Sequence, residues 1–392
     1  MGDRRSPPAE ETVRAALLGV IDPELGDNIV DLGMVRGVRV GDDGLVDVEI
    51  ALTVTGCPLR TQLRTDVERR VGSLPGVHGV QVDVGTMDDA ERAALMARAR
   101  AKAQEDRALD VDIPPTARVL AVSSGKGGVG KSSVTVNLAA ALADRGLVVG
   151  VLDADIWGFS VPRMLGMTGE LRAESKKIVP LERAVGAGRV KVVSMGFLAD
   201  EDTAIMWRGL ILNRAVQQFL EDVRWGELDY LLIDMPPGTG DVQMGLARML
   251  PRAEVLVVTT PPIAAQKVAA RAADMARKGH LRVAGVIENM AAFTCEHGAS
   301  YALFGEGGGE RLAADIGVPL VGRVPLHPAM ASAGDAGAPV ALGDGPLAEA
   351  FEAMSARIVE EIAPVVEVAG CTAQMLERVE RAVALEQPPA TS

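Results

Sequence analysis

The segment Ser-Gly-Lys-Gly-Gly-Val-Gly-Lys-Ser-Ser at residues 124–133 constrains the fold of this chain more than any other segment. It follows an apolar run at residues 119–122 and opens a helix-patterned run at residues 131–143. Glycines allow successive backbone N–H groups to turn toward one anion, and a helix start adds partial positive charge beneath it. A strand, this loop and a helix in that order therefore predict a phosphate-binding loop in an α/β sheet.

Each position of the loop has an expected role in binding a nucleoside triphosphate such as ATP. Lys131 can reach the β- and γ-phosphates, and the Ser132 hydroxyl can bind Mg²⁺. The predicted nucleotide-binding residues of the loop are Gly125, Lys126, Gly127, Gly128, Val129, Gly130, Lys131, Ser132 and Ser133. Lys126 is a second lysine that an ordinary loop of this kind does not require. It is either a solvated surface charge or a lysine that reaches the phosphates of a partner subunit, and spacing alone leaves both open.

Composition argues against some classes of function. Aromatic residues make up 3% of the chain, too few for a nucleic-acid binder built on base stacking. The formal net charge of −13 disfavours indiscriminate binding to DNA or to acidic membranes. No apolar run has the length of a membrane span. We therefore expect neither a nucleic acid nor a membrane as a partner.

The expected compartment is the cytoplasm. Residues 1–10 are polar and contain no apolar core of a signal peptide. Cys57, Cys295 and Cys371 are widely spaced and do not form a disulfide framework. Free thiols of this kind are typical of a reducing environment.

A chain of 392 residues is long enough for two domains. Residues 8–86 are predicted to form a small α+β domain, with helices at 12–20 and 60–71 and strands at 45–52 and 77–84. Residues 87–113 are predicted to be a helical linker, exposed on much of its surface, that ends at a Pro-Pro pair. Residues 114–366 are predicted to form the nucleotide-binding domain, and residues 367–392 a C-terminal helix (372–385) and a polar tail.

Short apolar runs alternate with helical stretches through the second domain. The predicted strands lie at residues 119–122, 148–152, 190–194, 230–233, 255–259, 283–288 and 319–324. This alternation predicts the α/β class, with a mostly parallel, doubly wound P-loop NTPase sheet that carries helices on both faces. Ligands bind at the carboxyl ends of such strands. The glycine-rich loop, Asp153, Asp234 and Asn289 each directly follow a predicted strand.

Two carboxylates follow the second strand of this domain, at Asp153 and Asp155. If the strand continued, its alternation would point both side chains the same way. One carboxylate can support Mg²⁺ and the other can orient the attacking water, and we assign the water to Asp155. A pair of loop carboxylates that caps the next helix is the alternative.

Asp234 ends an apolar strand, where a carboxylate can bridge to Mg²⁺ through water. The predicted magnesium set is therefore Ser132, Asp153 and Asp234. The Pro-Pro-Gly segment at residues 236–238 is stiff and then hinged, which suits a segment that senses the γ-phosphate.

The amide of Asn289 can donate to and accept from an adenine edge. A turn-forming asparagine is the alternative at that position.

Longer motifs resemble the Mrp/ApbC family of iron–sulfur cluster carrier ATPases, in the MinD/Mrp branch of P-loop NTPases with a deviant Walker A motif. The matching segments are residues 125–132, 153–158, 162–166, 207–209, 229–241, 288–290 and 304–305. The resemblance covers residues 116–364 nearly continuously. It implies a homodimer that binds ATP between its subunits and hydrolyses it slowly, with Lys126 acting across the interface. Lys126, Lys131 and Asp155 are then the catalytic candidates.

The first domain resembles a small metal–sulfur cluster assembly domain that is often fused ahead of such ATPases. The matching segments are residues 22–25, 29–33 and 52–59. A thiolate at Cys57 can ligate iron, and Asp22 and Glu24 are its candidate polar neighbours. A small buried cysteine is the alternative.

The family resemblance also implies that the protein carries a [4Fe–4S] cluster to apo iron–sulfur proteins, held between subunits by a Cys-x-x-Cys pair. This chain departs from that pattern, because residues 290–298 contain only Cys295. A dimer then supplies two thiolates instead of four. His297 is a candidate to complete the set, since His replaces Cys on iron in some clusters. The candidate cluster ligands are thus Cys295, His297 and Cys57, and the alternative is a site that has weakened or lost cluster binding.

Two other functions use the same ATP-driven dimerisation. A MinD/ParA-like spatial regulator needs a basic amphipathic tail for membranes or a basic face for DNA. The tail helix mixes Glu377 and Glu380 with Arg378 and Arg381, which argues against that function. An ATP-gated scaffold without a cluster is favoured by the missing second cysteine.

Overall fold

The computed structural model describes residues 6–23, 27–53, 59–88, 90–92, 94–95, 98, 112–155, 160–174, 177–194, 197, 209–238, 240–295 and 297–366. Its helices are α1 (Glu10–Leu17), α2 (Arg60–Gly72), α4 (Lys131–Asp144), α5 (Val161–Met164), α6 (Gly209–Asp222), α7 (Gly240–Met249), α8 (Ile263–Lys278), α9 (Gly308–Ile316), α10 (Ala329–Ala336) and α11 (Pro346–Arg357), with short turns η3 (Val340–Leu342) and η4 (Ile358–Ile362). Its strands are β1 (Ile21–Asp22), β2 (Asp27–Asn28), β3 (Val35–Val40), β4 (Leu45–Leu52), β5 (Gly79–Thr86), β6 (Arg118–Ser124), β7 (Val148–Asp153), β8 (Arg172–Glu174), β9 (Lys177–Val179), β10 (Leu181–Val185), β11 (Gly188–Ser194), β12 (Tyr230–Asp234), β13 (Glu254–Thr259), β14 (Arg282–Thr294), β15 (Ser300–Tyr301) and β16 (Leu320–Leu326).

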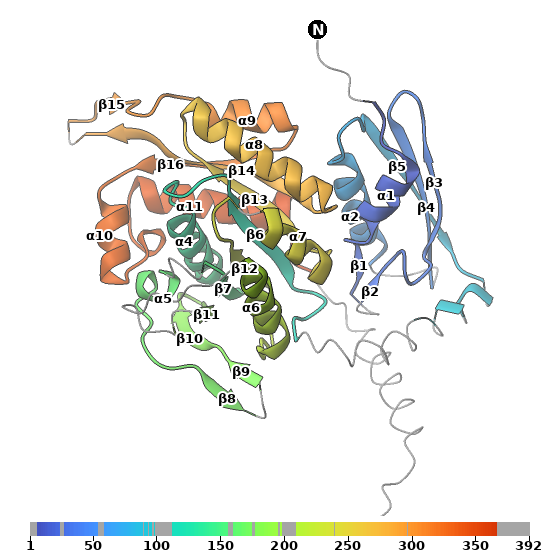
Figure 1. Cartoon of the computed structure of the whole chain (residues 1–392), viewed down its shortest axis with the longest axis horizontal. Coiled ribbons are helices and arrows are strands. Elements are labelled where there is room, and N and C mark those ends of the chain that lie inside the picture. The colour runs from blue at the N-terminus through green and yellow to red at the C-terminus, as the bar shows by residue number, and fades with distance from the viewer. Residues whose placement is uncertain are drawn as a thin grey trace, which may run out of the picture.

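A nine-stranded sheet forms the centre of the second domain (Figure 1). Its order is β10-β11-β7-β12-β6-β13-β14-β15, and β16 also pairs with β14. The β10–β11 and β14–β15 pairs are antiparallel. The other pairs of this sheet are parallel. The strands predicted from the sequence are all present within two residues of their expected starts, so the α/β class with a mostly parallel sheet is confirmed.

Helices cover both faces of the sheet because its central strands are buried throughout. Every residue of β12 and of β13 is buried. Leu231 packs in the same core as Phe219 of α6, whereas its neighbour Leu232 packs in the core that contains Leu138 of α4. Successive side chains of a strand point to opposite faces, so one short apolar run supplies both cores. Burying each such side chain contributes about 1.5–3 kcal/mol to the free energy of unfolding. The sheet is therefore a rigid scaffold for the loops at its edge.

The first domain is a small α+β unit with its own core, in agreement with the expected architecture. Its sheet joins β3 to β4 antiparallel and β4 to β5 parallel. Val67 of α2 and Ile50 of β4 are fully buried in that core. The strand β3 was not predicted, because Gly37 and two arginines obscure its pattern. Leu95, within the predicted linker, is also fully buried in this core.

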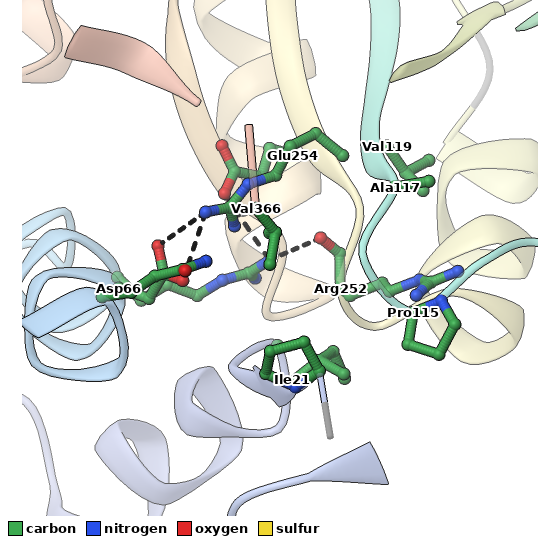
Figure 2. Close-up of a pocket in the computed structure, with 13 residues that line it drawn as sticks. Ile21, Asp66, Pro115, Ala117, Val119, Arg252, Glu254 and Val366 are labelled. Atoms are coloured by element: carbon green, nitrogen blue, oxygen red, sulfur yellow. Dashed lines mark hydrogen bonds and ion pairs between the residues drawn. The ribbon is translucent and has the colours of Figure 1, made fainter. Parts of the chain in front are cut away.

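The two domains meet at the amino ends of the central strands. Arg118, at the start of β6, approaches Asp66 of α2, with 3.2 Å between Nη2 and Oδ1. Arg70 of α2 donates to the carbonyl of Arg252 at 2.6 Å and lies 3.9 Å from the Glu254 carboxylate. Figure 2 shows Asp66 and Glu254 entering this junction from α2 and β13. The glycine-rich loop follows the carboxyl end of β6, so it lies at the opposite end of the sheet.

The strand that holds Asn289 is longer than predicted. β14 runs from Arg282 to Thr294, so Asn289 lies inside the strand instead of following it. Long-range pairing with β16 and a short hairpin with β15 supply the hydrogen bonds, and neither partner is visible in the local pattern. The strand therefore continues through residues 290–294, beyond its predicted end at residue 288. The predicted tail helix at 372–385 lies outside the described residues.

Candidate nucleotide site

The glycine-rich loop connects β6 directly to α4. Gly128 and Gly130 have φ of +80° and +76°, in the left-handed region that favours glycine. A Cβ on Gly127 or Gly128 would meet no other atom within 4 Å, so this part of the loop borders open space. The Ser124 hydroxyl donates to the Lys126 carbonyl at 3.0 Å and braces the start of the loop. The local sequence thus leaves room for a ligand beside the backbone.

A pocket of about 220 Å³ lies over this loop. It is lined by Ser124, Lys126, Gly127, Gly128, Val129, Gly130, Lys131, Ser132, Ser133, Asp155, Ser160, Met164 and Pro237. Eight of the nine predicted loop residues, all but Gly125, therefore line one pocket, together with Asp155 from the end of β7 and Pro237 from the loop after β12. Lys126 is exposed at this pocket, whereas Lys131 is buried.

Asp234 lies beneath the pocket and binds the start of α4. Its Oδ1 lies 2.6 Å from the Lys131 ammonium, and its Oδ2 accepts a hydrogen bond of 2.5 Å from Ser132. The Thr135 hydroxyl is 3.0 Å from the same Oδ1. Thr135 is not among the residues predicted from the sequence, although a residue four positions after Lys131 lies on the same face of a helix.

Asp153 lies beside Asp234 because β7 and β12 pair in parallel with these residues in register. The Ser194 hydroxyl, at the end of β11, donates to Asp153 at 3.0 Å and is a second contact that the sequence did not reveal. Burial, and then the negative charge of Asp234, raise the pKa of Asp153 to about 7. Two buried carboxylates with one nearby ammonium and three hydroxyls form an oxygen-rich site, which fits Mg²⁺.

Asp155 and Asp153 have different surroundings. β7 ends at Asp153, which is 1% exposed, whereas Asp155 is partly exposed and lines the pocket above. The Asp155 backbone N–H donates to Asp153 Oδ1 at 3.2 Å. The two carboxylates therefore lie at different depths of one site. Because the strand ends at Asp153, the alternation of a strand does not point both side chains the same way.

Cys295 and His297 lie at the tip of the hairpin that joins β14 to β15. The Cys295 N–H donates to the Ala299 carbonyl at 3.0 Å, and the Gly298 N–H donates to the Cys295 carbonyl at 2.9 Å. Cys295 is a free, partly exposed thiol and His297 is exposed. Within the described residues no group of three or more His, Cys, Asp or Glu side chains is arranged to hold a metal. Cys57 lies outside the described residues.

Two family models match this chain and identify its family. Residues 116–362 match the model of the NUBPL iron-transfer P-loop NTPases. The chain belongs to this family. Residues 10–84 match a second model, described as an iron–sulfur cluster assembly protein. The resemblance to cluster-carrier P-loop ATPases that the motifs indicated is thereby confirmed.

Curated relatives align with most of this chain. The iron–sulfur cluster carrier protein of Mycobacterium tuberculosis is 47% identical over 87% of this chain and 90% of the relative. That of Synechocystis is 40% identical over 90% of this chain and 97% of the relative. Among solved structures, a nucleotide-binding protein in complex with ADP from Archaeoglobus fulgidus is 36% identical, with a TM-score of 0.48 over 56% of this chain and 86% of that chain.

The match to the NTPase family covers the glycine-rich loop, Lys131 and Asp234. None of the helices in the described part of the chain combines the length and apolar character that a membrane span requires. The site that the structure assembles therefore consists of a phosphate pocket, a carboxylate pair beneath it and a cysteine hairpin on the continuation of β14.

Proposed function

We propose that this chain binds ATP with Mg²⁺, hydrolyses it slowly and, as a cytoplasmic homodimer, carries iron–sulfur clusters to apo iron–sulfur proteins. The observation that carries the proposal is the contact of Lys131 and Ser132 with Asp234 directly beneath the glycine-rich loop. Family membership supports the nucleotide chemistry. Relatives named as iron–sulfur cluster carrier proteins support the cargo.

The phosphates bind in the pocket over the loop, where backbone N–H groups and the start of α4 favour negative charge. Lys131 exchanges its contact with Asp234 for the β- and γ-phosphates. Ser132, Asp153 and Asp234 hold Mg²⁺, whose positive charge polarises the phosphoryl oxygens. The two buried carboxylates, placed side by side by the pairing of β7 with β12, support this assignment.

Hydrolysis depends on Asp155 and on the second lysine. Asp155 lines the phosphate pocket and orients the attacking water. Lys126 is exposed at the same pocket, where it can reach the phosphates of a partner subunit. A lysine supplied across a dimer interface stabilises the charge that develops on the transferred phosphoryl group.

The cluster is cargo, bound where two copies bring their Cys295 hairpins together. Two Cys295 thiolates and two His297 imidazoles then supply four ligands, the number that a [4Fe–4S] cluster takes. Cys57 of the first domain is a second candidate ligand. The partial exposure of the free Cys295 thiol supports a role for this hairpin in binding.

Anaerobic reconstitution with iron and sulfide tests the cargo, with both elements quantified per dimer and the visible spectrum recorded for wild type, Cys57→Ala and Cys295→Ala. We expect Cys295→Ala to lose the cluster while its ATP affinity stays at the wild-type value. A cluster lost only in Cys57→Ala would move the cargo to the first domain. A reconstituted wild type that binds no iron and activates no apo cluster enzyme would refute the carrier function.

The second candidate function is an ATP-gated scaffold. The single cysteine of residues 290–298 favours it, because one subunit then offers one thiolate in this segment. This function predicts ATP binding and ATP-dependent partner contacts with no bound iron in any variant. The same reconstitution therefore separates the two functions.

A further inference from the structure

The side chain of Asn289 contacts the backbone of the glycine-rich loop. Its Nδ2 donates to the Val129 carbonyl at 2.8 Å, across 160 residues of chain. Asn289 is 4% exposed, and Val129 is 2% exposed. A buried amide hydrogen bond of this kind fixes both groups, since breaking it leaves a buried carbonyl without a partner.

This contact determines which way one N–H of the loop points. The peptide bond between Val129 and Gly130 is trans, so its C=O and N–H groups point in opposite directions. With the Val129 carbonyl held by Asn289, the Gly130 N–H faces away from Asn289. Gly130 lines the phosphate pocket, so this N–H is one of the donors available to a phosphate.

The fit between Asn289 and the loop is close. A Cβ on Gly130 would lie 2.3 Å from Asn289 Nδ2 and 3.8 Å from the end of the Met290 side chain. Gly130 thus needs to be glycine for two reasons, its φ of +76° and the position of Asn289. A shift of the loop at this point would also disturb the hydrogen bond from Asn289 to Val129.

That strand continues from Asn289 to the cysteine hairpin. Met290 has a φ of +56°, which is strained for a residue with a side chain. The pairing of β14 with β16 shifts between Asn289 and Phe293, where a bulge interrupts the ladder. Phe293 then pairs with Tyr301, and Cys295 follows two residues later. A strained bulge is the part of a strand that changes conformation most readily.

We propose that Asn289 is a positioning residue that orients the phosphate loop and couples its occupancy to the Cys295 hairpin. The inference rests on the proposed binding of nucleotide by this loop. It assigns the Asn289 amide to the loop backbone and thus predicts an effect on any ligand with a polyphosphate, whether or not it carries adenine.

Binding of Mg–tripolyphosphate, which has no base, tests the first part by calorimetry. We expect Asn289→Asp to weaken binding of both tripolyphosphate and ATP about tenfold, because a carboxylate oxygen replaces the donor that faces the Val129 carbonyl. Asn137→Asp is the matched control, since Asn137 is equally buried and donates to the Ser133 carbonyl of α4 at 2.8 Å. It should keep both affinities. An Asn289→Asp protein that loses ATP affinity but binds tripolyphosphate like wild type would overturn the inference and favour recognition of adenine.

Alkylation of Cys295 by iodoacetamide tests the coupling, with the Cys57 and Cys371 peptides as internal references in mass spectrometry. We expect saturating Mg–tripolyphosphate to change the Cys295 rate about fivefold in wild type and in Asn137→Asp. In Asn289→Asp at saturation the change should be lost. An unchanged rate in wild type, or the same change in Asn289→Asp, would overturn the coupling.

These results are separable from the proposed function. A wild type that binds no ATP would overturn both the proposed function and this inference. A wild type that binds ATP but no cluster affects only the carrier function, because neither test uses iron. Equal tripolyphosphate affinity in wild type and Asn289→Asp overturns the inference alone.

Discussion

Asp234 receives three donors from a single helix, and this concentration of contacts explains much of the site at the scale of residues. Lys131, Ser132 and Thr135 all reach its two carboxylate oxygens. Asp153 lies beside it, and its pKa is raised to about 7 by burial and by the neighbouring charge. The residues beneath the phosphate pocket are therefore held in place before any ligand binds, which lowers the entropy cost of binding.

Replacement of Lys131 should remove the main cation for the phosphates. We expect Lys131→Ala to weaken ATP binding by about 2 kcal/mol or more, the value of a hydrogen bond to a charged group, which is about thirtyfold. Calorimetric titration with Mg–ATP measures it. Lys278→Ala is the control, because Lys278 is an exposed lysine that pairs with Asp274 on α8. Equal affinities for the two variants would contradict the role of Lys131.

Replacement of Asp155 should separate hydrolysis from binding. Because Asp155 lines the pocket and contributes no backbone of the loop, we expect Asp155→Ala to keep its ATP affinity and to hydrolyse ATP about 100-fold more slowly. Phosphate release under saturating ATP is the measurement. The exposed Asp315 of α9 offers a control in Asp315→Ala, which should match wild type. Normal turnover in Asp155→Ala would show that another group orients the water.

At the scale of elements, the connection between the glycine-rich loop and α4 is the main feature of the site. Gly130 is the residue before α4 and has a left-handed backbone. It also lies against Asn289 of β14, so the loop is held between the first turn of α4 and a strand two positions away from β6 in the sheet order. Loop conformation therefore depends on strand packing as well as on glycine content.

Gly130→Ala should damage nucleotide binding more than its backbone cost alone explains. The matched control is Gly317→Ala, where φ is +66° but a Cβ would meet nothing within 4 Å. Both changes should lower the free energy of unfolding by about 1 kcal/mol, because an alanine is strained in the left-handed backbone conformation. Only Gly130→Ala should also lose ATP affinity, since its Cβ would collide with Asn289. Urea unfolding and ATP titration of both variants give the comparison, and unaltered ATP affinity in Gly130→Ala would be the contrary result.

At the scale of the whole molecule, the first domain is attached by a charged and largely buried junction. Arg69 donates to the Ile362 carbonyl at 2.6 Å and Arg118 donates to the Pro364 carbonyl at 2.7 Å, so the end of the chain's last described helix joins the contact. Glu254 lies between Arg282 and Arg70. Burial alone raises the pKa of Glu254, but these arginines outweigh it, and the net pKa falls below the ordinary 4.5.

Glu254→Gln should destabilise the protein in a pH-dependent way. Removing one partner of a buried pair costs about 3 kcal/mol in the free energy of unfolding. Because the folded pKa of Glu254 is depressed, its contribution is present above pH 4.5 and is lost as the pH falls through the folded pKa. Urea unfolding at pH 7.5 and at progressively lower pH measures the difference from wild type, which should shrink in acid. Glu227→Gln removes an exposed pair with Arg189 and should cost about 0.5 kcal/mol or less.

Much of the fold could be predicted because it depends on local patterns. Buried parallel strands such as β12 and β13 are short apolar runs, and α4 begins at the lysine where the glycine pattern ends. The short strands β8, β9 and β10 escaped prediction, since partly exposed residues beside turns carry no clear period. The second half of β14 escaped for a related reason, because it depends on partners elsewhere in the chain.

The sequence by itself determined the phosphate loop, the order of the main parallel strands, and the family. Each of these follows from residues that are neighbours in the chain, where glycine freedom, apolar period and helix start act locally. Only the tertiary structure decided that Lys131 meets Asp234 across 103 residues, that Asn289 holds Val129 across 160 residues, and that Arg69 reaches Ile362 across 293 residues. Such contacts have no local signature, because they exist only once the sheet and its helices have packed.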